Sequence, residues 1–164
     1  MDTGQKPGCD LVTGALGFAG LHLVGALLRA GHTVVGLGRQ PDGTPSPASA
    51  GDFRRHPGAA SGLPVAYAGP DGRLDYHETG LEDAAALARI VEVERPRVIY
   101  HLAAQSSAAA SFEAPHETFT ANLLGTLNLL EAVRALPVGD RPLLIAVGSA
   151  EEYGPQPEDA PPLT

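Results

Sequence analysis

Short apolar runs alternate along this chain with longer stretches in which apolar residues recur every three or four positions. The apolar runs predict buried strands, and the longer stretches predict helices that turn one face inward. The expected strands are residues 9–13, 33–37, 74–78, 97–102 and 143–147, and the expected helices are residues 18–30, 81–94 and 115–136. This alternation predicts an α/β fold, a Rossmann-type doubly wound parallel sheet of about five strands.

A segment rich in glycine and proline interrupts the alternation at residues 38–72. Both residue types favour turns, so we expect a long surface loop there with at most one short strand, near residues 65–68. The end of the chain, from residue 154 on, is also proline-rich and predicts a loop.

Charge and composition exclude several classes of function. The 164 residues contain 11 Lys and Arg against 19 Asp and Glu, a formal net charge of -8. Nucleic acids and anionic membranes attract clustered cations, so we expect neither as a partner. No signal segment and no run of 18 apolar residues occurs, so we expect a cytoplasmic protein without a membrane span. Cys9 is the only cysteine and the six His show no metal-like spacing, so we expect no disulfide and no metal site.

Three glycines, Gly14, Gly17 and Gly20, lie between the first expected strand and the first expected helix. Gly14 allows a tight turn, Gly17 removes a side chain where a pyrophosphate must approach the backbone, and Gly20 lets the helix pack closely on the strand. The N–H groups at the helix start, near Phe18, then face the phosphates. This order of strand, glycine loop and helix predicts dinucleotide binding. The alternative is that the glycines only form a turn and bind nothing.

Four short motifs follow one another along the chain: VTGALGFAG at residues 12–20, HLAAQS at 101–106, NLLGT at 122–126 and GSAEEYG at 148–154. Together they resemble the extended short-chain dehydrogenase/reductases, the family of the nucleotide-sugar epimerases, dehydratases and reductases. The resemblance implies that residues 1–164 are the NAD(P)-binding Rossmann domain of such an enzyme, truncated before its C-terminal strands and substrate lobe. It also implies a nucleotide-sugar substrate and a homodimer formed through the helix at residues 115–136.

The motifs suggest roles for individual residues. The expected cofactor-binding residues are Thr13, Gly14, Gly17, Phe18, Gly20, Arg39, Leu81, Leu102, Ala103 and Ala104. Gln105 and Ser106 are expected to contact the sugar or nucleotide of the substrate. By resemblance, Asn122 orients backbone or water beneath the site, and the alternative is an amide that only packs its helix.

Arg39 follows the second expected strand and bears on the choice of cofactor. A guanidinium can bind a phosphate through two hydrogen bonds, so Arg39 favours NADP over NAD, unless it is only a solvated surface residue. Gly80 stands where the family usually carries an aspartate that contacts adenine. We therefore expect the adenine contact to come from the backbone of Gly80 or Leu81.

Catalytic chemistry is expected after the last strand. By resemblance, Ser149 hydrogen-bonds the oxygen of the sugar carbon that is oxidised or reduced, and Glu151 removes a proton next to a ketone, as in the dehydratases. The string SAEEYG at residues 149–154 is nearer to that of the 4-keto-6-deoxy-sugar reductases. We therefore expect an NADP-dependent reductase of a GDP-linked 4-keto-6-deoxymannose. The alternative is a GDP-mannose 4,6-dehydratase or another nucleotide-sugar epimerase or dehydratase.

The family's hydride chemistry uses a Tyr-x-x-x-Lys pair, and this chain has none. Its only lysine is Lys6, and Pro157 stands four residues after Tyr153. We expect the pair just beyond residue 164 and no turnover by this chain alone. Two further hypotheses stay open, a non-catalytic NADP-binding module and one half of a split enzyme whose partner supplies the pair.

Overall fold

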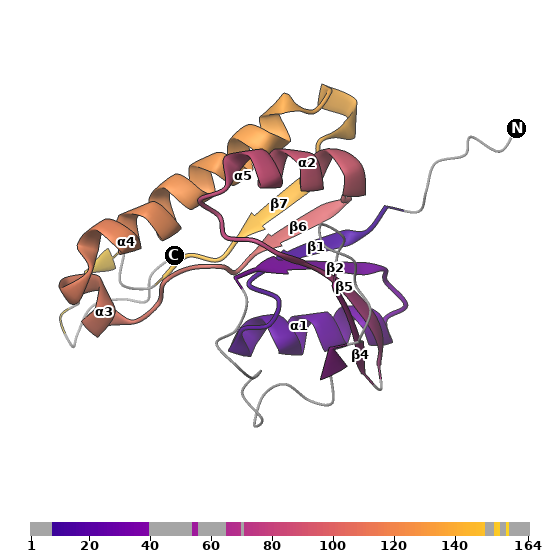
Figure 1. Ribbon diagram of the computed structural model, residues 1–164, viewed down its shortest axis with the longest axis horizontal. Coiled ribbons are helices and arrows are strands. Elements are labelled where there is room, and N and C mark those ends of the chain that lie inside the picture. Colours follow the sequence, from indigo (N-terminus) through magenta and orange to yellow (C-terminus); the bar gives the residue numbers. More distant parts are fainter. Residues whose placement is uncertain are drawn as a thin grey trace, which may run out of the picture.

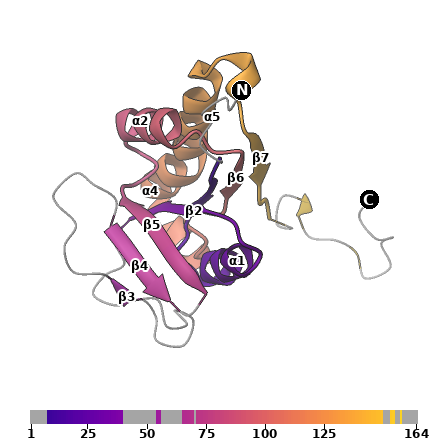
Figure 2. The ribbon, with the colours of Figure 1, turned by 90° about the vertical axis from the view of Figure 1, so that its right-hand side faces the viewer.

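A seven-stranded sheet organises the computed structural model, which describes residues 8–39, 54–55, 65–69, 71–149, 153–154 and 157. The strands stand in the order β3-β4-β5-β2-β1-β6-β7 (Figure 1; β3 is labelled in Figure 2). Their bounds are β1 Asp10–Thr13, β2 Val34–Gly38, β3 Arg54–Arg55, β4 Val65–Gly69, β5 Gly72–Glu78, β6 Val98–His101 and β7 Leu143–Ala146. The helices are α1 Phe18–Arg29, α2 Ala84–Glu94, α3 Ala108–Glu113, α4 Pro115–Phe119 and α5 Gly125–Ala135, with a π-helical turn η1 at Thr120–Leu124 and a 3-10 turn η2 at Val138–Asp140.

Five of the strands, β5, β2, β1, β6 and β7, run parallel, which confirms the predicted doubly wound sheet. The short strand predicted near residues 65–68 is β4, which pairs antiparallel with β5. The hairpin between them closes at the pair Gly69 and Gly72, and Gly72 has a φ of 137°, a conformation that suits glycine. The two-residue strand β3 extends the sheet further and was not expected from the sequence.

The sheet is covered on both faces (Figure 2). Helix α1 packs on one face, where Val12 of β1 joins its buried cluster, and α2 and α5 pack on the other, where Leu11 joins theirs. Successive strand residues point to opposite faces, so a strand covered on both faces is apolar throughout its length. All four residues of β1, the central strand, are buried, and only its two end residues, Asp10 and Thr13, are polar.

The order of the strands creates a switch point between β1 and β6. From β1 the chain moves outward through β2 to β5, and it then returns to place β6 and β7 on the other side of β1. The connections leaving β1 and β6 therefore diverge at the carboxyl end of the sheet. Open α/β sheets bind ligands in the crevice that this divergence produces.

The single helix expected at residues 115–136 is wrong in detail, because the structure divides it into α4, η1 and α5. Phe119 and Gly125, on either side of the π-helical turn, keep ordinary right-handed dihedral angles, so the helical path continues through it. Hydrophobic spacing does not distinguish such a turn from an α-helical one over so short a stretch. Helix α2 also begins later than expected, because the Asp83 carboxylate caps it by accepting from the Ala86 N–H at 2.9 Å. No helix in the described ranges is long and apolar enough to cross a membrane.

Cys9 lies in the core between β1 and α2 and should be chemically inert. Its thiol is buried and contacts the Glu94 carbonyl at 3.5 Å, and burial raises its pKa from 9.0 to about 11. The thiolate is the reactive form, so at pH 8 ionisation alone makes it ~100-fold less reactive than an ordinary thiol. We expect the native protein to resist a thiol reagent at pH 8 and to react stoichiometrically after unfolding in guanidinium. Rapid labelling of the native chain, with Cys9→Ala as the blank, would contradict this burial.

Candidate functional site

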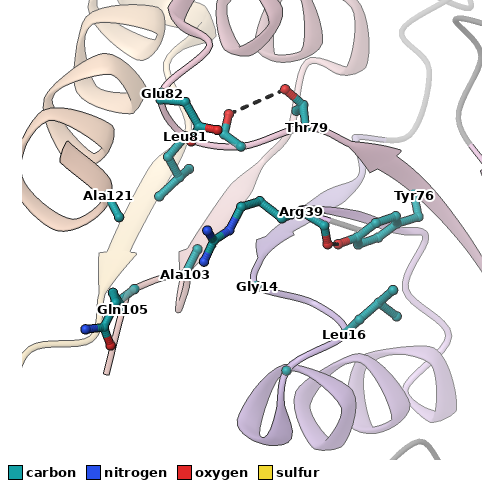
Figure 3. Close-up of a pocket in the computed structure, with 14 residues that line it drawn as sticks. Gly14, Leu16, Arg39, Tyr76, Thr79, Leu81, Glu82, Ala103, Gln105 and Ala121 are labelled. Carbon is teal, nitrogen blue, oxygen red and sulfur yellow. Dashed lines mark hydrogen bonds between the residues drawn. The ribbon is translucent and has the colours of Figure 1, made fainter. Parts of the chain in front are cut away.

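A cleft of about 430 Å³ opens at the carboxyl ends of β1, β2, β5 and β6 (Figure 3). It therefore lies at the switch point, between the glycine loop after β1 and the segments that follow the three neighbouring strands. Its lining residues are Gly14, Leu16, Gly17, Gly38, Arg39, Tyr76, Thr79, Gly80, Leu81, Glu82, Ala103, Ala104, Gln105 and Ala121.

The glycine loop is tightly packed beneath the cleft. Gly14 has a φ of 70°, and a Cβ there would lie 3.0 Å from the backbone nitrogen and Cα of Ala103. A Cβ at Gly20 would collide with the Gly14 carbonyl and with the backbone of Ala15. The loop can therefore follow this path only with glycine at positions 14 and 20.

Gly17 is the N-cap residue of α1, and no side chain caps this helix. Its N–H donates to the Gly14 carbonyl at 2.9 Å, so the loop closes on itself just before the helix begins. The first N–H groups of a helix have no partner within the helix and carry a partial positive charge. A loop with glycines at both ends, Gly14 and Gly17, in front of such a helix start is suited to hold a diphosphate.

Thr13, the last residue of β1, lies below the loop and does not line the cleft. Its side chain is fully buried, and Oγ1 accepts hydrogen bonds from the N–H groups of Leu102 at 3.2 Å and Ala103 at 3.1 Å. The same hydroxyl lies 2.8 Å from Nδ1 of His101. A hydroxyl offers one donor and two acceptor positions, so Thr13 uses all three.

The protonation of His101 follows from its other partner. Thr126 donates its hydroxyl to the Asn122 carbonyl at 2.6 Å, so it can only accept from His101 Nε2 at 2.9 Å. Burial lowers the pKa of His101 below its ordinary value of 6.5, which keeps the ring neutral. The proton therefore sits on Nε2, and Nδ1 accepts from Thr13.

Asn122 continues this chain of hydrogen bonds to the wall of the cleft. Its amide oxygen accepts from the Gln105 N–H at 2.7 Å, and its amide nitrogen donates to the Gln105 carbonyl at 3.0 Å. Asn122 thus holds both polar groups of one backbone residue, as the sequence suggested when it assigned this side chain to orienting backbone. The π-helical turn η1 carries this amide toward the segment after β6.

The opposite wall follows β5. The Thr79 N–H donates to the Gly38 carbonyl at 3.0 Å, and the Leu81 carbonyl accepts from the Asn128 amide of α5 at 2.9 Å. Gly80 lies between these fixed points, and the Glu82 carboxylate occupies the space where a side chain at position 80 would begin. A carboxylate therefore faces the cleft at this wall although position 80 itself has no side chain.

Arg39 is the first residue after β2 and is exposed. Its side chain extends across the cleft toward Ala103 (Figure 3). The guanidinium therefore lies near the glycine loop, where an anionic ligand would come within reach of both.

The structure brings six of the ten expected cofactor residues into this one cleft. The lining includes Gly14, Gly17, Arg39, Leu81, Ala103 and Ala104, and also the expected substrate residue Gln105. The other four expected cofactor residues do not line it: Thr13 and Gly20 lie beneath the loop, Leu102 packs toward the α1-side cluster, and Phe18 points outward against His22. Ser106 and Ser149 are exposed and also lie outside the lining, and Glu151 falls outside the described residues.

Sequence reasoning missed Tyr76 and Glu82 as lining residues. Tyr76 has the hydrophobic pattern of an ordinary core residue, but it lies opposite Gly36 and its hydroxyl lies beside Gly38. The two glycines at alternate positions of β2 could have indicated that a large side chain packs against that strand. Glu82 lies in the turn after β5, where no periodic pattern indicates that its carboxylate lies beside Gly80.

Comparisons with known proteins identify the family and the fold of the chain. The family model described as GDP-mannose 4,6 dehydratase matches residues 11–162. A GDP-mannose 4,6-dehydratase from Sinorhizobium fredii is 32% identical over 157 residues, which cover 92% of this chain and 41% of that protein. The solved UDP-glucose 4-epimerase of Thermus thermophilus, in complex with NAD, is 33% identical over 76% of this chain and 33% of its own, with a TM-score of 0.56.

A UDP-glucose 4-epimerase from Stenotrophomonas maltophila, 21% identical with a TM-score of 0.68, shares the fold over 94% of this chain and 40% of its own. The chain thus spans less than half the length of the relatives it matches.

The neutral His101 makes stability depend on pH. Its pKa is lowered in the folded state, so between that pKa and 6.5 the unfolded chain binds a proton that the folded chain does not. The free energy of unfolding should therefore fall as pH drops below about 6.5, by at most about 1.4 kcal/mol per pH unit for one such group. Urea unfolding at pH 7.5 and 5.5 measures the effect, and His101→Gln, which cannot titrate, should show a smaller pH dependence. Equal dependence in both proteins would contradict the assigned proton positions.

Proposed function

The chain belongs to the GDP-mannose 4,6-dehydratase family, and we propose that its residues form the NADP-binding part of an enzyme acting on a GDP-linked sugar. The observation that carries the proposal is the cleft at the switch point, where a helix start without a side-chain cap and a loop with Gly14 and Gly17 at its ends lie in one lining with the Arg39 guanidinium. These features match a ligand with a diphosphate and a further phosphate nearby.

The glycine loop fits the diphosphate of the cofactor. Side chains at Gly14 or Gly17 would fill or distort the place where the phosphates approach, and the N–H groups at the start of α1 supply donors. The bound nicotinamide would accept and return the hydride in the reaction. The residues of this chain bind and orient it.

Two side chains support recognition of the adenosine end. The Arg39 guanidinium can bind a ribose 2′-phosphate, which only NADP carries. The Glu82 carboxylate beside Gly80 can accept a hydrogen bond from the exocyclic amine of the base. This contact would replace the adenine contact expected from the backbone of Gly80 or Leu81.

For the reaction, the family match favours the dehydratase over the reductase that the string at residues 149–154 first suggested. In a dehydratase we assign Glu151 to removing the proton next to the sugar ketone and Ser149 to binding the oxygen of the reacting carbon. Residues 1–164 contain no Tyr-x-x-x-Lys pair. These residues alone are therefore expected to bind the cofactor without turning over a sugar, whether the pair lies further along the same protein or on a partner chain.

Titration with NADPH and NADH, followed by nicotinamide fluorescence, tests cofactor binding. We expect tighter binding of NADPH, and Arg39→Ala should weaken NADPH by roughly 10-fold, equal to about 1.4 kcal/mol, while NADH changes little. Glu82→Gln should weaken both cofactors equally, because the base is common to them.

The matched control is Arg89→Ala, which removes the same charge from an exposed position on α2 outside the cleft. Loss of NADPH affinity in this variant would mean that overall charge, and not Arg39, sets the preference. Failure of the unaltered chain to bind either cofactor would defeat the proposal and favour the hypothesis of a fold that binds nothing.

We also propose that the chain forms a homodimer through the helical path of α4, η1 and α5. This surface exposes apolar side chains, Phe119 at 64%, Leu123 at 59%, Leu127 at 49% and Leu130 at 45%. Burying such a stripe against a second copy would remove apolar area from water.

The dimer can be tested by light scattering on a sizing column. We expect twice the chain mass of 16.8 kDa for the unaltered protein and the monomer mass for Leu127→Glu. Val93→Glu places the same charge on α2, where Val93 is 71% exposed, and should leave the dimer intact. A monomeric unaltered protein would contradict the proposal.

A further inference from the structure

Tyr76 of β5 fills the space that two glycines of β2 leave open. It lies directly opposite Gly36 in the parallel register, and it is 1% exposed. A Cβ at Gly36 would come within 2.7 Å of the Tyr76 ring, and a Cβ at Gly38 within 2.6 Å of its hydroxyl. Residues 36 and 38 point to the same face of the strand, so together they form a trough that holds the aromatic side chain along its length.

The end of this side chain reaches the cleft. The Tyr76 hydroxyl donates to the carbonyl of Arg39 at 3.2 Å, and the Arg39 side chain extends into the cleft from the same residue (Figure 3). The ladder between β2 and β5 ends at the pair Gly38 and Glu78. The hydroxyl therefore binds the first carbonyl beyond the ladder.

The rigid placement of the Tyr76 ring fixes the hydrogen bond between its hydroxyl and the Arg39 carbonyl. A tyrosine held in a close-fitting trough has little freedom, so its hydroxyl fixes the Arg39 carbonyl relative to the core. Without that hydrogen bond the backbone at residue 39 could turn, and the direction in which its side chain leaves the strand would turn with it. A bidentate contact between guanidinium and phosphate depends strongly on that direction.

We infer that Tyr76 is a positioning residue for Arg39 and thereby sets the preference of the cleft for a nucleotide with a 2′-phosphate. The inference rests on the proposed cofactor function and adds a residue to it that carries no charge and touches no phosphate. Gly36 and Gly38 contribute to the same positioning, because any side chain at either residue would displace the Tyr76 ring or its hydroxyl.

Tyr76→Phe is the direct test, because it keeps the ring in its trough and removes only the hydroxyl. We expect NADPH affinity to fall about 3- to 10-fold, with NADH affinity unchanged and the melting temperature nearly unchanged. Gly38→Ala should shift the ratio of the two affinities in the same direction while Tyr76 stays intact. The control is Tyr100→Phe, a tyrosine of β6 that packs against the same α1-side cluster but does not line the cleft.

A double variant identifies the route of the effect. If Tyr76 acts through Arg39, then Tyr76→Phe should cost no further NADPH affinity in the Arg39→Ala background. Equal loss of NADPH and NADH, no loss of either, or a full additional loss in the double variant would overturn the inference while leaving cofactor binding established. Absence of all binding by the unaltered chain would overturn the proposed function and this inference together.

Discussion

The hydroxyl of Thr13 is the contact on which the geometry of the cleft depends. It sits at the end of the central strand and binds the first two N–H groups of the segment after β6. These bonds hold Ala103 against the glycine loop, so closely that a Cβ at Gly14 would lie 3.0 Å from its backbone. The floor of the cleft is therefore built from two strand ends joined by one side chain. A valine in place of Thr13 would keep the shape and leave two N–H groups without that acceptor.

The third hydrogen bond of Thr13 begins a chain of hydrogen bonds that reaches Gln105 in the wall of the cleft. It donates to a neutral His101, which donates to Thr126, which in turn donates to the carbonyl of Asn122. The side-chain amide of Asn122 then forms hydrogen bonds with both the N–H and the carbonyl of Gln105. Each bond has only one possible direction, so the chain cannot reverse without leaving a buried group unpaired. A cleft supported in this way is set by the core before any ligand arrives, which lowers the conformational cost of binding.

Hydrophobic spacing and glycine placement were enough to predict the parallel strands, their helices and the loop on which the cleft depends. These features are predictable because burial on both faces imposes an apolar run, and a tight turn before a helix requires glycine at defined positions. The π-helical turn at residues 120–124 was not predictable, since it changes backbone pairing without changing the apolar pattern.

The place of Tyr76 depends on which residues the strand register brings face to face, and a single strand read alone does not contain that information. The place of the Glu82 carboxylate beside Gly80 depends on the path of the turn after β5. Thr13 was expected to contact the cofactor, and its side chain is buried outside the lining of the cleft. The hydroxyl faces the interior, where its capacity is fully used.

The overall charge of the chain limits which forces can hold an anionic ligand in the cleft. A protein with a formal net charge of -8 repels a polyanionic cofactor at long range, so no general electrostatic attraction can account for binding. At physiological salt, charges separated by more than about 8 Å are largely screened, and contacts within hydrogen-bond distance are not. The cofactor binding proposed above must therefore come from short-range donors, for which the N–H groups at the start of α1 and the guanidinium of Arg39 are the candidates. Short-range donors act only where they are held in place, and for that reason the uncharged side chains that hold them, Thr13 below the loop and Tyr76 beside Arg39, matter as much to the site as the charge itself.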